Sequence, residues 1–413
     1  MPALASAARH VAIESTRLLQ EQRGIGRYVR NVVREFAVQR PQLRFTFFVA
    51  NTSETGRVRA LLDTLHPSLN ERSWIASAKR LPSTDADIVW YPWNFVTVPA
   101  RTATMVVTVH DIAPMLQLDH RWWKVLKRAK YRSRYRRTVN RAHAIVTDSM
   151  FSRHELVSKV QADASRISVT LLAADDLPLQ AADDIAPLEA ARVDGAFFLT
   201  VGGQDARKNL VTLYAAMQAL WARGVRIPLV QCGPAPARET RALLGHTPWL
   251  QHVGYVTDAQ LAALYRRCTA LVFPSRYEGF GLPVAEAMRA GAPVICTRES
   301  SVPEVAGNAA YYVPWQDAAQ MADAMQQLAE HEAMRAGLRE AGRHQSALFS
   351  WAATARDTMI AFERAISERG VMTLHTAPLP TVLPSLLSPS LPTPLTTPAV
   401  VAAPPRLHGA HDA

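Results

Sequence analysis

The sequence contains few cysteines and no long apolar run. Its three cysteines, Cys232, Cys268 and Cys296, lie far apart and form no C-x-x-C pair, so neither a disulfide framework nor a zinc site is predicted. No stretch offers the roughly 18 apolar residues that a membrane-spanning helix needs, and the start, MPALASAARH, lacks the apolar core of a secretory signal. We therefore expect a cytoplasmic protein that touches the inner face of the cytoplasmic membrane through its surface alone.

Acidic residues are in the minority. Among 413 residues, 35 Asp and Glu stand against 46 Lys and Arg, which gives a formal net charge of +11. This excess suits an anionic partner, such as nucleotide phosphate, nucleic acid or lipid headgroups, and does not choose among them. The chain is longer than a single hydrophobic core usually supports, so two domains are expected.

Short apolar runs rich in strand-forming residues alternate with helical patterns. Examples are FTFFVA at 45–50, DIVWYP at 87–92, MVVTVH at 105–110 and AIVTDS at 144–149. Such alternation is typical of βαβ units around parallel sheets, so the fold class is α/β with two doubly wound sheets. The expected segments are an N-terminal domain at 1–172, a linker at 173–194, a C-terminal domain at 195–349, a last helix at 350–370 and a disordered Pro-rich tail at 371–413.

Two glutamates follow the predicted strand ALVFPS, in the segment RYEGFGLPVAEAM. Glu278 falls in the loop and Glu286 in the first turns of the next helix. Free N–H groups and two carboxylates at one helix N-terminus suit a ligand with both phosphate and polyol parts. Gly279 and Gly281 would let the backbone approach that ligand closely. The alternative is a tight strand-to-helix turn without a ligand.

A second glycine-containing loop, GGQDARKN, follows the predicted strand FFLTV. Gly202 and Gly203 loosen the turn, and Arg207 and Lys208 present two cations just before a helix. Such a loop can hold a diphosphate, although it lacks the P-loop spacing. The alternative is a solvated surface pair.

These two motifs, together with SVPEVAG at 301–307, resemble the retaining glycosyltransferases of family four. The resemblance runs from about residue 11 to 370 and includes that family's pair of glutamates separated by seven residues. It implies the GT-B fold, in which two Rossmann-like domains face each other across a cleft and the C-terminal domain binds the nucleotide-sugar donor. It also implies that the last helix crosses back to the N-terminal domain, which would bind most of the acceptor.

The resemblance also assigns roles to the residues of the C-terminal motifs. Glu286 would hold the donor ribose, and Glu278 would contact the transferred sugar. Arg207 and Lys208 would neutralise the departing diphosphate. Backbone amides would come from Phe280, Gly281 and Leu282.

The N-terminal half carries three further candidates. The segment QRGIGRYVRNVVREF resembles the family's first loop and helix, where Gly24 and Gly26 would lie beside the donor phosphates. His110, at the carboxyl end of a strand, would by the same resemblance hydrogen-bond the donor sugar across from Glu278; otherwise it is a histidine bonded within a loop. Glu14 occupies a position where relatives often have Asp.

No metal or other cofactor is expected. Asp85-Ala-Asp87 spells the D-x-D signature of the other glycosyltransferase fold, but it precedes a strand, whereas a metal-diphosphate site belongs after one. The resemblance implies that Arg207 and Lys208 replace the metal. It also implies retention by front-face attack, in which the leaving phosphate helps to accept the acceptor proton.

The segment 121–141 holds ten Lys or Arg and no acid. Interfacial helices pair basic faces with aromatic anchors, so this helix could dock on an anionic membrane beside a lipid-linked acceptor. The alternative is an exposed helix whose aromatics pack on the sheet. The aromatic residues within it are Trp122, Trp123, Tyr131 and Tyr135.

The residues and the resemblance together predict a retaining hexosyltransferase. Similarity to mannosyltransferases that build bacterial surface polysaccharide, such as lipopolysaccharide O-antigen, makes GDP-mannose the expected donor, ahead of UDP-sugars. The acceptor would be lipid-linked or polysaccharide. A nucleotide-sugar epimerase or a glucan synthase of the same fold remains an alternative, and a nucleic-acid-binding protein is a more remote one because no recognised motif accompanies the basic segment.

Overall fold

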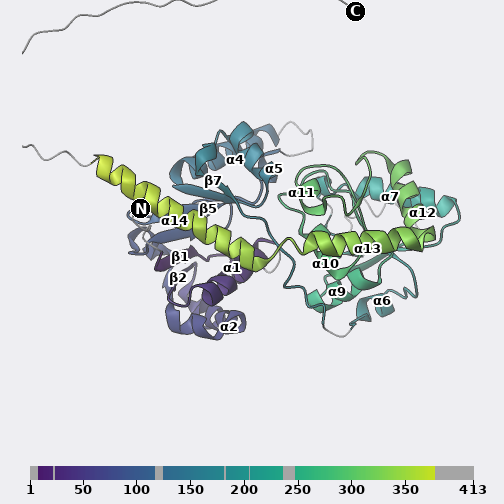
Figure 1. Ribbon diagram of the computed structural model, residues 1–413, viewed down its shortest axis with the longest axis horizontal. Helices are drawn as coiled ribbons and strands as arrows, with labels where there is room; N and C mark the ends of the chain where they lie inside the picture. The colour runs from purple at the N-terminus through teal and green to yellow at the C-terminus, as the bar shows by residue number, and fades with distance from the viewer. Residues whose placement is uncertain are drawn as a thin grey trace, which may run out of the picture.

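The computed structural model describes residues 8–21, 24–116, 124–180, 183–203, 205–235 and 247–376. They form two α/β domains, each built on an all-parallel sheet, which lie side by side in Figure 1. The expected pair of doubly wound, Rossmann-like domains is confirmed.

The N-terminal sheet has seven strands in the order β3-β2-β1-β4-β5-β6-β7. Strands such as TMVVT are buried along their whole length, because helices cover both faces of a parallel sheet. The strands are β1 (His10–Glu14), β2 (Arg44–Val49), β3 (Ser73–Ser77), β4 (Ile88–Tyr91), β5 (Thr104–Thr108), β6 (Ala144–Thr147) and β7 (Ile167–Val169). The main helices are α1 (Ile25–Gln39), α2 (Thr55–Leu65), α3 (Ala113–Leu116), α4 (Lys124–Arg141), α5 (Met150–Glu155) and the π-helix η4 (Leu156–Val160).

The C-terminal sheet has six strands in the order β10-β9-β8-β11-β12-β13. A capping box formed by Thr257 and Gln260 opens α9, and Gly291 ends α10 in a left-handed conformation at φ 79°. The strands are β8 (Phe198–Val201), β9 (Leu229–Cys232), β10 (Leu250–Gly254), β11 (Ala270–Phe273), β12 (Val294–Cys296) and β13 (Tyr311–Tyr312). The helices are α7 (Leu210–Ala222), α9 (Asp258–Arg267), α10 (Leu282–Ala290), α11 (Val302–Ala306), α12 (Ala318–Glu330) and α13 (Glu332–Ser346).

The last helix, α14 (Trp351–Thr376), leaves the C-terminal domain and lies along α1 of the N-terminal domain (Figure 1). Phe362 packs its ring against Phe36 at 5.8 Å and against Trp90 at 5.9 Å. The helix corrects one boundary, since it continues to Thr376, whereas the tail was predicted to begin at 371.

The predicted linker contributes ordered contacts. It contains the short helix α6 (Ala186–Ala190). Before that helix, Asp175 accepts the backbone N–H of Trp351 at 3.0 Å, and Asp176 accepts the indole N–H of the same residue at 2.8 Å. The linker and the start of α14, the two places where the described chain passes between the domains, are therefore bonded to each other.

Strand order reverses beside the first strand of each sheet. β1 lies between β2 and β4, and β8 lies between β9 and β11. In open parallel sheets, ligands bind outside the carboxyl ends of the strands at such a reversal. The loops that follow β8 and β11 are the two loops singled out in the sequence.

Candidate active site

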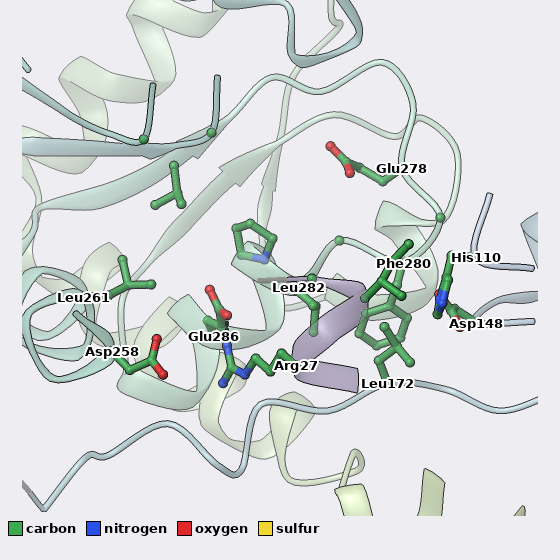
Figure 2. Close-up of a pocket in the computed structure, with 18 of the residues that line it drawn as sticks. Arg27, His110, Asp148, Leu172, Asp258, Leu261, Glu278, Phe280, Leu282 and Glu286 are labelled. Carbon is green, nitrogen blue, oxygen red and sulfur yellow. Dashed lines mark hydrogen bonds and ion pairs between the residues drawn. The ribbon is translucent and has the colours of Figure 1, made fainter. Parts of the chain in front are cut away.

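A cavity of about 610 Å³ lies between the two domains, at the carboxyl ends of both sheets. Figure 2 shows side chains from both domains around it, with Glu286 and Arg27 pointing toward each other and His110 beside Asp148. Ten of the twelve predicted site residues line it: Gly24, His110, Arg207, Lys208, Glu278, Gly279, Phe280, Gly281, Leu282 and Glu286.

Gly26 and Gly203 are not among the residues that line the cavity. A side chain at Gly26 would place Cβ 1.6 Å from the carbonyl oxygen of Glu21, and one at Gly203 would place it 3.0 Å from the Pro234 ring. Close packing against Glu21 and Pro234 thus explains why glycine occupies both positions.

Glu278 is held by the other predicted loop. Its Oε1 accepts hydrogen bonds from the Lys208 ammonium at 2.7 Å and the Ser275 hydroxyl at 2.5 Å. The backbone N–H of Glu278 donates to the Ser300 hydroxyl at 2.9 Å. Within the described parts of the chain, Oε2 has no hydrogen-bond partner, so one carboxylate oxygen remains available to a ligand.

The N-terminus of α10 opens onto the cavity. Gly281 precedes it with φ 107°, a conformation that favours glycine. The backbone N–H groups of Phe280, Gly281 and Leu282 donate to none of the residues that the structure describes. These free donors and the positive end of the helix dipole form a site suited to an anion.

Glu286 belongs to a buried charge cluster that the sequence analysis missed. The Arg27 guanidinium, from α1, contacts Oε1 of Glu286 and makes a bidentate pair with Asp176, with both hydrogen bonds at 2.6 Å. The Tyr265 hydroxyl donates to Oε2 of Glu286 at 2.9 Å. Burial alone would raise the pKa of Asp176, but the hydrogen bonds and positive charge of Arg27 outweigh burial, so the pKa of Asp176 is lowered. Each Glu286 oxygen keeps a lone pair for a further donor.

Arg207 reaches across the cleft. Its guanidinium lies 3.4 Å from the carboxylate of Asp111, in the N-terminal domain, and 3.1 Å from that of Asp205. Burial raises the pKa of Asp111, against the opposing charge of Arg207. Arg207 and Lys208 thus lie in the cavity already paired with carboxylates.

Both ring nitrogens of His110 are engaged by the protein. Nδ1 lies 2.7 Å from the Asp148 carboxylate and Nε2 lies 2.9 Å from the Pro92 carbonyl oxygen. Burial disfavours the imidazolium, but the charge of Asp148 and these hydrogen bonds outweigh it, so the pKa of His110 is raised. A hydrogen bond from the ring to a sugar would require one of these contacts to open, and Asp148 is a further residue that the sequence analysis missed.

The two domains touch beside the cavity. The Glu304 carboxylate, on α11, accepts the backbone N–H groups of Met150 at 2.8 Å and Phe151 at 2.7 Å, at the start of α5. The Ser149 hydroxyl donates to the carbonyl oxygen of Gly279 at 2.7 Å. The described cleft is therefore closed at this point.

Gly279→Ala is expected to destabilise the protein by about 1 to 3 kcal/mol, the usual cost of overpacking. The new Cβ would lie 2.3 Å from the carbonyl oxygen of His110, which is backbone of the opposite domain. Chemical denaturation would measure the loss. The control is Gly56→Ala in α2, where a Cβ meets nothing within 4 Å and the helix should gain stability. Equal stability of the two variants would contradict the close domain contact.

The remaining candidates lie away from the cavity lining. Asp87 accepts the backbone N–H groups of Arg9 and His10 at 2.8 and 2.9 Å, next to the start of β1. Glu14 is buried at the end of β1, where its backbone carbonyl accepts the indole N–H of Trp93 at 2.7 Å. Across the described residues, no group of three or more metal-ligating side chains is found.

Two parallel-sheet domains that present their carboxyl ends to one shared cavity define the GT-B class. Residues 183–345 match the family model of glycosyl transferases group 1. The chain is 29% identical over 385 residues to O-antigen chain mannosyltransferase B of Escherichia coli. The aligned region covers 82% of this chain and 96% of that relative. Among solved structures, sucrose-phosphate synthase from Thermosynechococcus elongatus has a TM-score of 0.67 at 19% identity, covering 87% of this chain and all (100%) of that one.

The chain is also 30% identical over 283 residues to the serotype-specific mannosyltransferase WbdA of Escherichia coli; the match covers 65% of this chain but 34% of WbdA, so it spans about a third of that relative. The chain has the GT-B fold and resembles bacterial mannosyltransferases. The comparisons support glycosyltransferase activity. Within the described residues, no helix combines the length and apolarity required to cross a bilayer.

Proposed function

We propose that this protein is a retaining, metal-independent mannosyltransferase that uses GDP-mannose to extend a lipid-linked or polysaccharide acceptor in O-antigen synthesis. The observation that carries the proposal is the arrangement around α10: free N–H groups at its N-terminus, with Glu278 and Glu286 lining the same cavity. The names of the mannosyltransferase relatives support the choice of sugar and pathway.

The donor would fit these groups by chemical type. Ribose hydroxyls would donate to the spare lone pairs of Glu286, and the diphosphate would accept from the α10 amides. Arg207 and Lys208 would turn from their carboxylate partners toward the phosphates, which supply negative charge in their place. Two cations beside a diphosphate can stabilise the leaving group without a metal.

Retention would follow from front-face attack. The accessible oxygen of Glu278 would accept a hydrogen bond from a sugar hydroxyl, while Oε1 stays bonded to the Ser275 hydroxyl. The leaving phosphate would help to accept the acceptor proton. NMR of the product would report the anomeric configuration, and an inverted product would exclude this mechanism.

Membrane contact through the basic helix is proposed on charge alone. Tyr135 is fully buried and packs its ring 4.8 Å from Phe95, and Tyr131 packs partly buried against the same core. These two aromatics therefore follow the alternative in which the aromatics of the helix pack on the domain, whereas Trp122 and Trp123 lie outside the described residues. We still expect the enzyme to act at the inner face of the cytoplasmic membrane, without a nucleic-acid partner.

A thermal-shift panel of nucleotide sugars tests the proposed donor. GDP-mannose is expected to raise the unfolding temperature more than UDP-sugars do, because a ligand of the folded state stabilises it according to its concentration over Kd. Glu286→Gln should weaken this shift by loss of ribose acceptors, while Glu299→Gln, outside the cavity lining, should not. Stabilisation that is equal in both variants would remove Glu286 from the donor site.

An acceptor assay separates the proposed transferase from an epimerase of the same fold. A transferase forms a glycosylated product that depends on added acceptor. An epimerase converts the nucleotide sugar without any acceptor.

A further inference from the structure

A second cavity, of about 720 Å³, lies on the N-terminal domain between α3, α4 and η4. Five of the ten residues that line it are cationic and none is acidic. The cations are Arg128, Arg132, Arg136, Arg137 and Lys159; we call this set, with its cavity, the arginine pocket.

One face of α4 supplies most of the arginine pocket. Arg128, Arg132, Arg136 and Asn140 recur every four residues, which places them along one side of the helix. Tyr135, which is buried in the domain core, lies on the adjoining face, seven residues after Arg128. Arg128 and Arg132 are exposed and Arg136 is half-buried, so these three arginines border the buried face of the helix and remain partly open to solvent.

These cations are poorly neutralised. Lys159 pairs with Glu155 at 2.8 Å, but Arg128, Arg132 and Arg137 make no ion pair with any residue that the structure describes. Arg136 donates to the Gln161 side chain at 2.7 Å, while its Nε is buried without a partner among the described residues. Like charges gathered in one hollow repel one another, and an anion would relieve that repulsion.

The chemistry of the lining indicates which anion fits. Arginine guanidinium groups bind phosphate oxygens in forked, bidentate geometry. Met115 and Leu116, from α3, give the same hollow an apolar part. No aromatic ring lines it, so nucleic-acid bases would find no stacking partner among the described lining residues.

The arginine pocket is joined to the donor cavity by the chain itself. Met115 follows Asp111, which faces Arg207 in the donor cavity, by four residues. The Tyr135 hydroxyl, from α4, donates to the carbonyl oxygen of Asp111 at 2.9 Å. A ligand anchored here would lie on the side of the cleft that belongs to the N-terminal domain.

We propose that the arginine pocket binds the phosphate or diphosphate of an ester whose organic part is apolar, as in the carrier of a lipid-linked acceptor. The inference rests on the proposed function for its biological setting. Two sources could supply this chemistry, a lipid-diphosphate acceptor or the phospholipids of the membrane, and the experiment below separates them.

The test is calorimetric titration of the full chain with geranyl diphosphate, without any nucleotide sugar. Arg128→Ala/Arg132→Ala removes two exposed pocket cations, and Lys127→Ala/Lys130→Ala removes two exposed cations of α4 that do not line the pocket. We expect the first variant to bind at least tenfold more weakly than wild type and the second to stay within twofold. Neither variant changes the cavity between the domains, so any binding of geranyl diphosphate there is the same in all three proteins.

Sedimentation with vesicles of phosphatidylglycerol and phosphatidylcholine gives the second arm. If Arg128→Ala/Arg132→Ala alone loses affinity for geranyl diphosphate, while both variants bind vesicles equally, the result supports an acceptor carrier as the ligand. If Arg128→Ala/Arg132→Ala alone loses both affinity for geranyl diphosphate and binding to vesicles, the result supports a phospholipid headgroup as the ligand. Equal losses in the two variants, or no binding of geranyl diphosphate by wild type, would overturn the proposal.

The binding result is independent of the transfer assay. If wild type transfers mannose while both variants bind geranyl diphosphate alike, the proposed function stands and this inference fails. If binding depends on Arg128 and Arg132 while no nucleotide sugar stabilises the protein, the inference stands and the proposed function fails.

Discussion

Arg27→Met is expected to lower the free energy of unfolding by about 3 to 5 kcal/mol, the range for breaking a buried ion pair by removing one partner. The buried Glu286 and the mostly buried Asp176 would then remain charged without their cation. Denaturation in guanidinium chloride, followed by tryptophan fluorescence, would measure the loss.

The control for Arg27 is a surface pair with the same chemistry. Arg40 lies 3.5 Å from Glu363 with half (50%) of its side chain exposed, and exposed pairs contribute at most about 1 kcal/mol. Arg40→Met should therefore unfold nearly as wild type does. A loss below about 1 kcal/mol for Arg27→Met would mean that the buried cluster is not a structural support.

Lys208→Ala is expected to reduce kcat by about 10²- to 10³-fold, the cost of removing one group that stabilises developing charge. Lys208 lines the cavity between the domains, and in the proposed mechanism its ammonium would meet the departing diphosphate. Steady-state kinetics with GDP-mannose and acceptor would measure the change. Lys208→Arg should recover part of the rate, because it restores the charge but not the compact ammonium.

Arg276→Ala is the matched control for Lys208. Arg276 follows Ser275 in the neighbouring loop, lies over the Trp315 ring at 3.9 Å and does not line the cavity. Arg276→Ala removes one cation near the site without removing the proposed phosphate contact. The kcat should therefore change less than about threefold, far less than on loss of a charge that contacts the leaving group. Equal effects of the two substitutions would indicate general electrostatics rather than a contact with the leaving group.

Local sequence patterns were sufficient for the two sheets and for the C-terminal half of the site. Strands such as β5 and β11 are continuous apolar runs, and the loop of Glu278 and the helix of Glu286 come after β11, so the position of both glutamates near its carboxyl end could be predicted. Gly281 and Gly291 mark the two ends of α10 by a backbone conformation that glycine adopts readily.

Partners distant in sequence could not be predicted in this way. Arg27 meets Asp176 across 149 positions and Glu286 across 259, and no helical or strand period links such residues. His110 and Asp148 follow different strands, 38 positions apart. The charge pattern of α4 likewise did not reveal that Tyr135 faces the core, because a single sequence does not fix which side of a basic helix is covered.

The bond between the linker and the start of α14 constrains how the two lobes can move. Because the two interdomain connections are hydrogen-bonded to each other, they act as a single hinge. The domains can rotate about this hinge, but sliding of one domain past the other is opposed. Arg27, which shares Asp176 with Trp351, holds the Glu286 side of the cavity to the hinge. Opening would therefore separate the Gly279 loop of one domain from the His110 loop of the other by more than it separates Arg27 from Glu286, which lie near the axis.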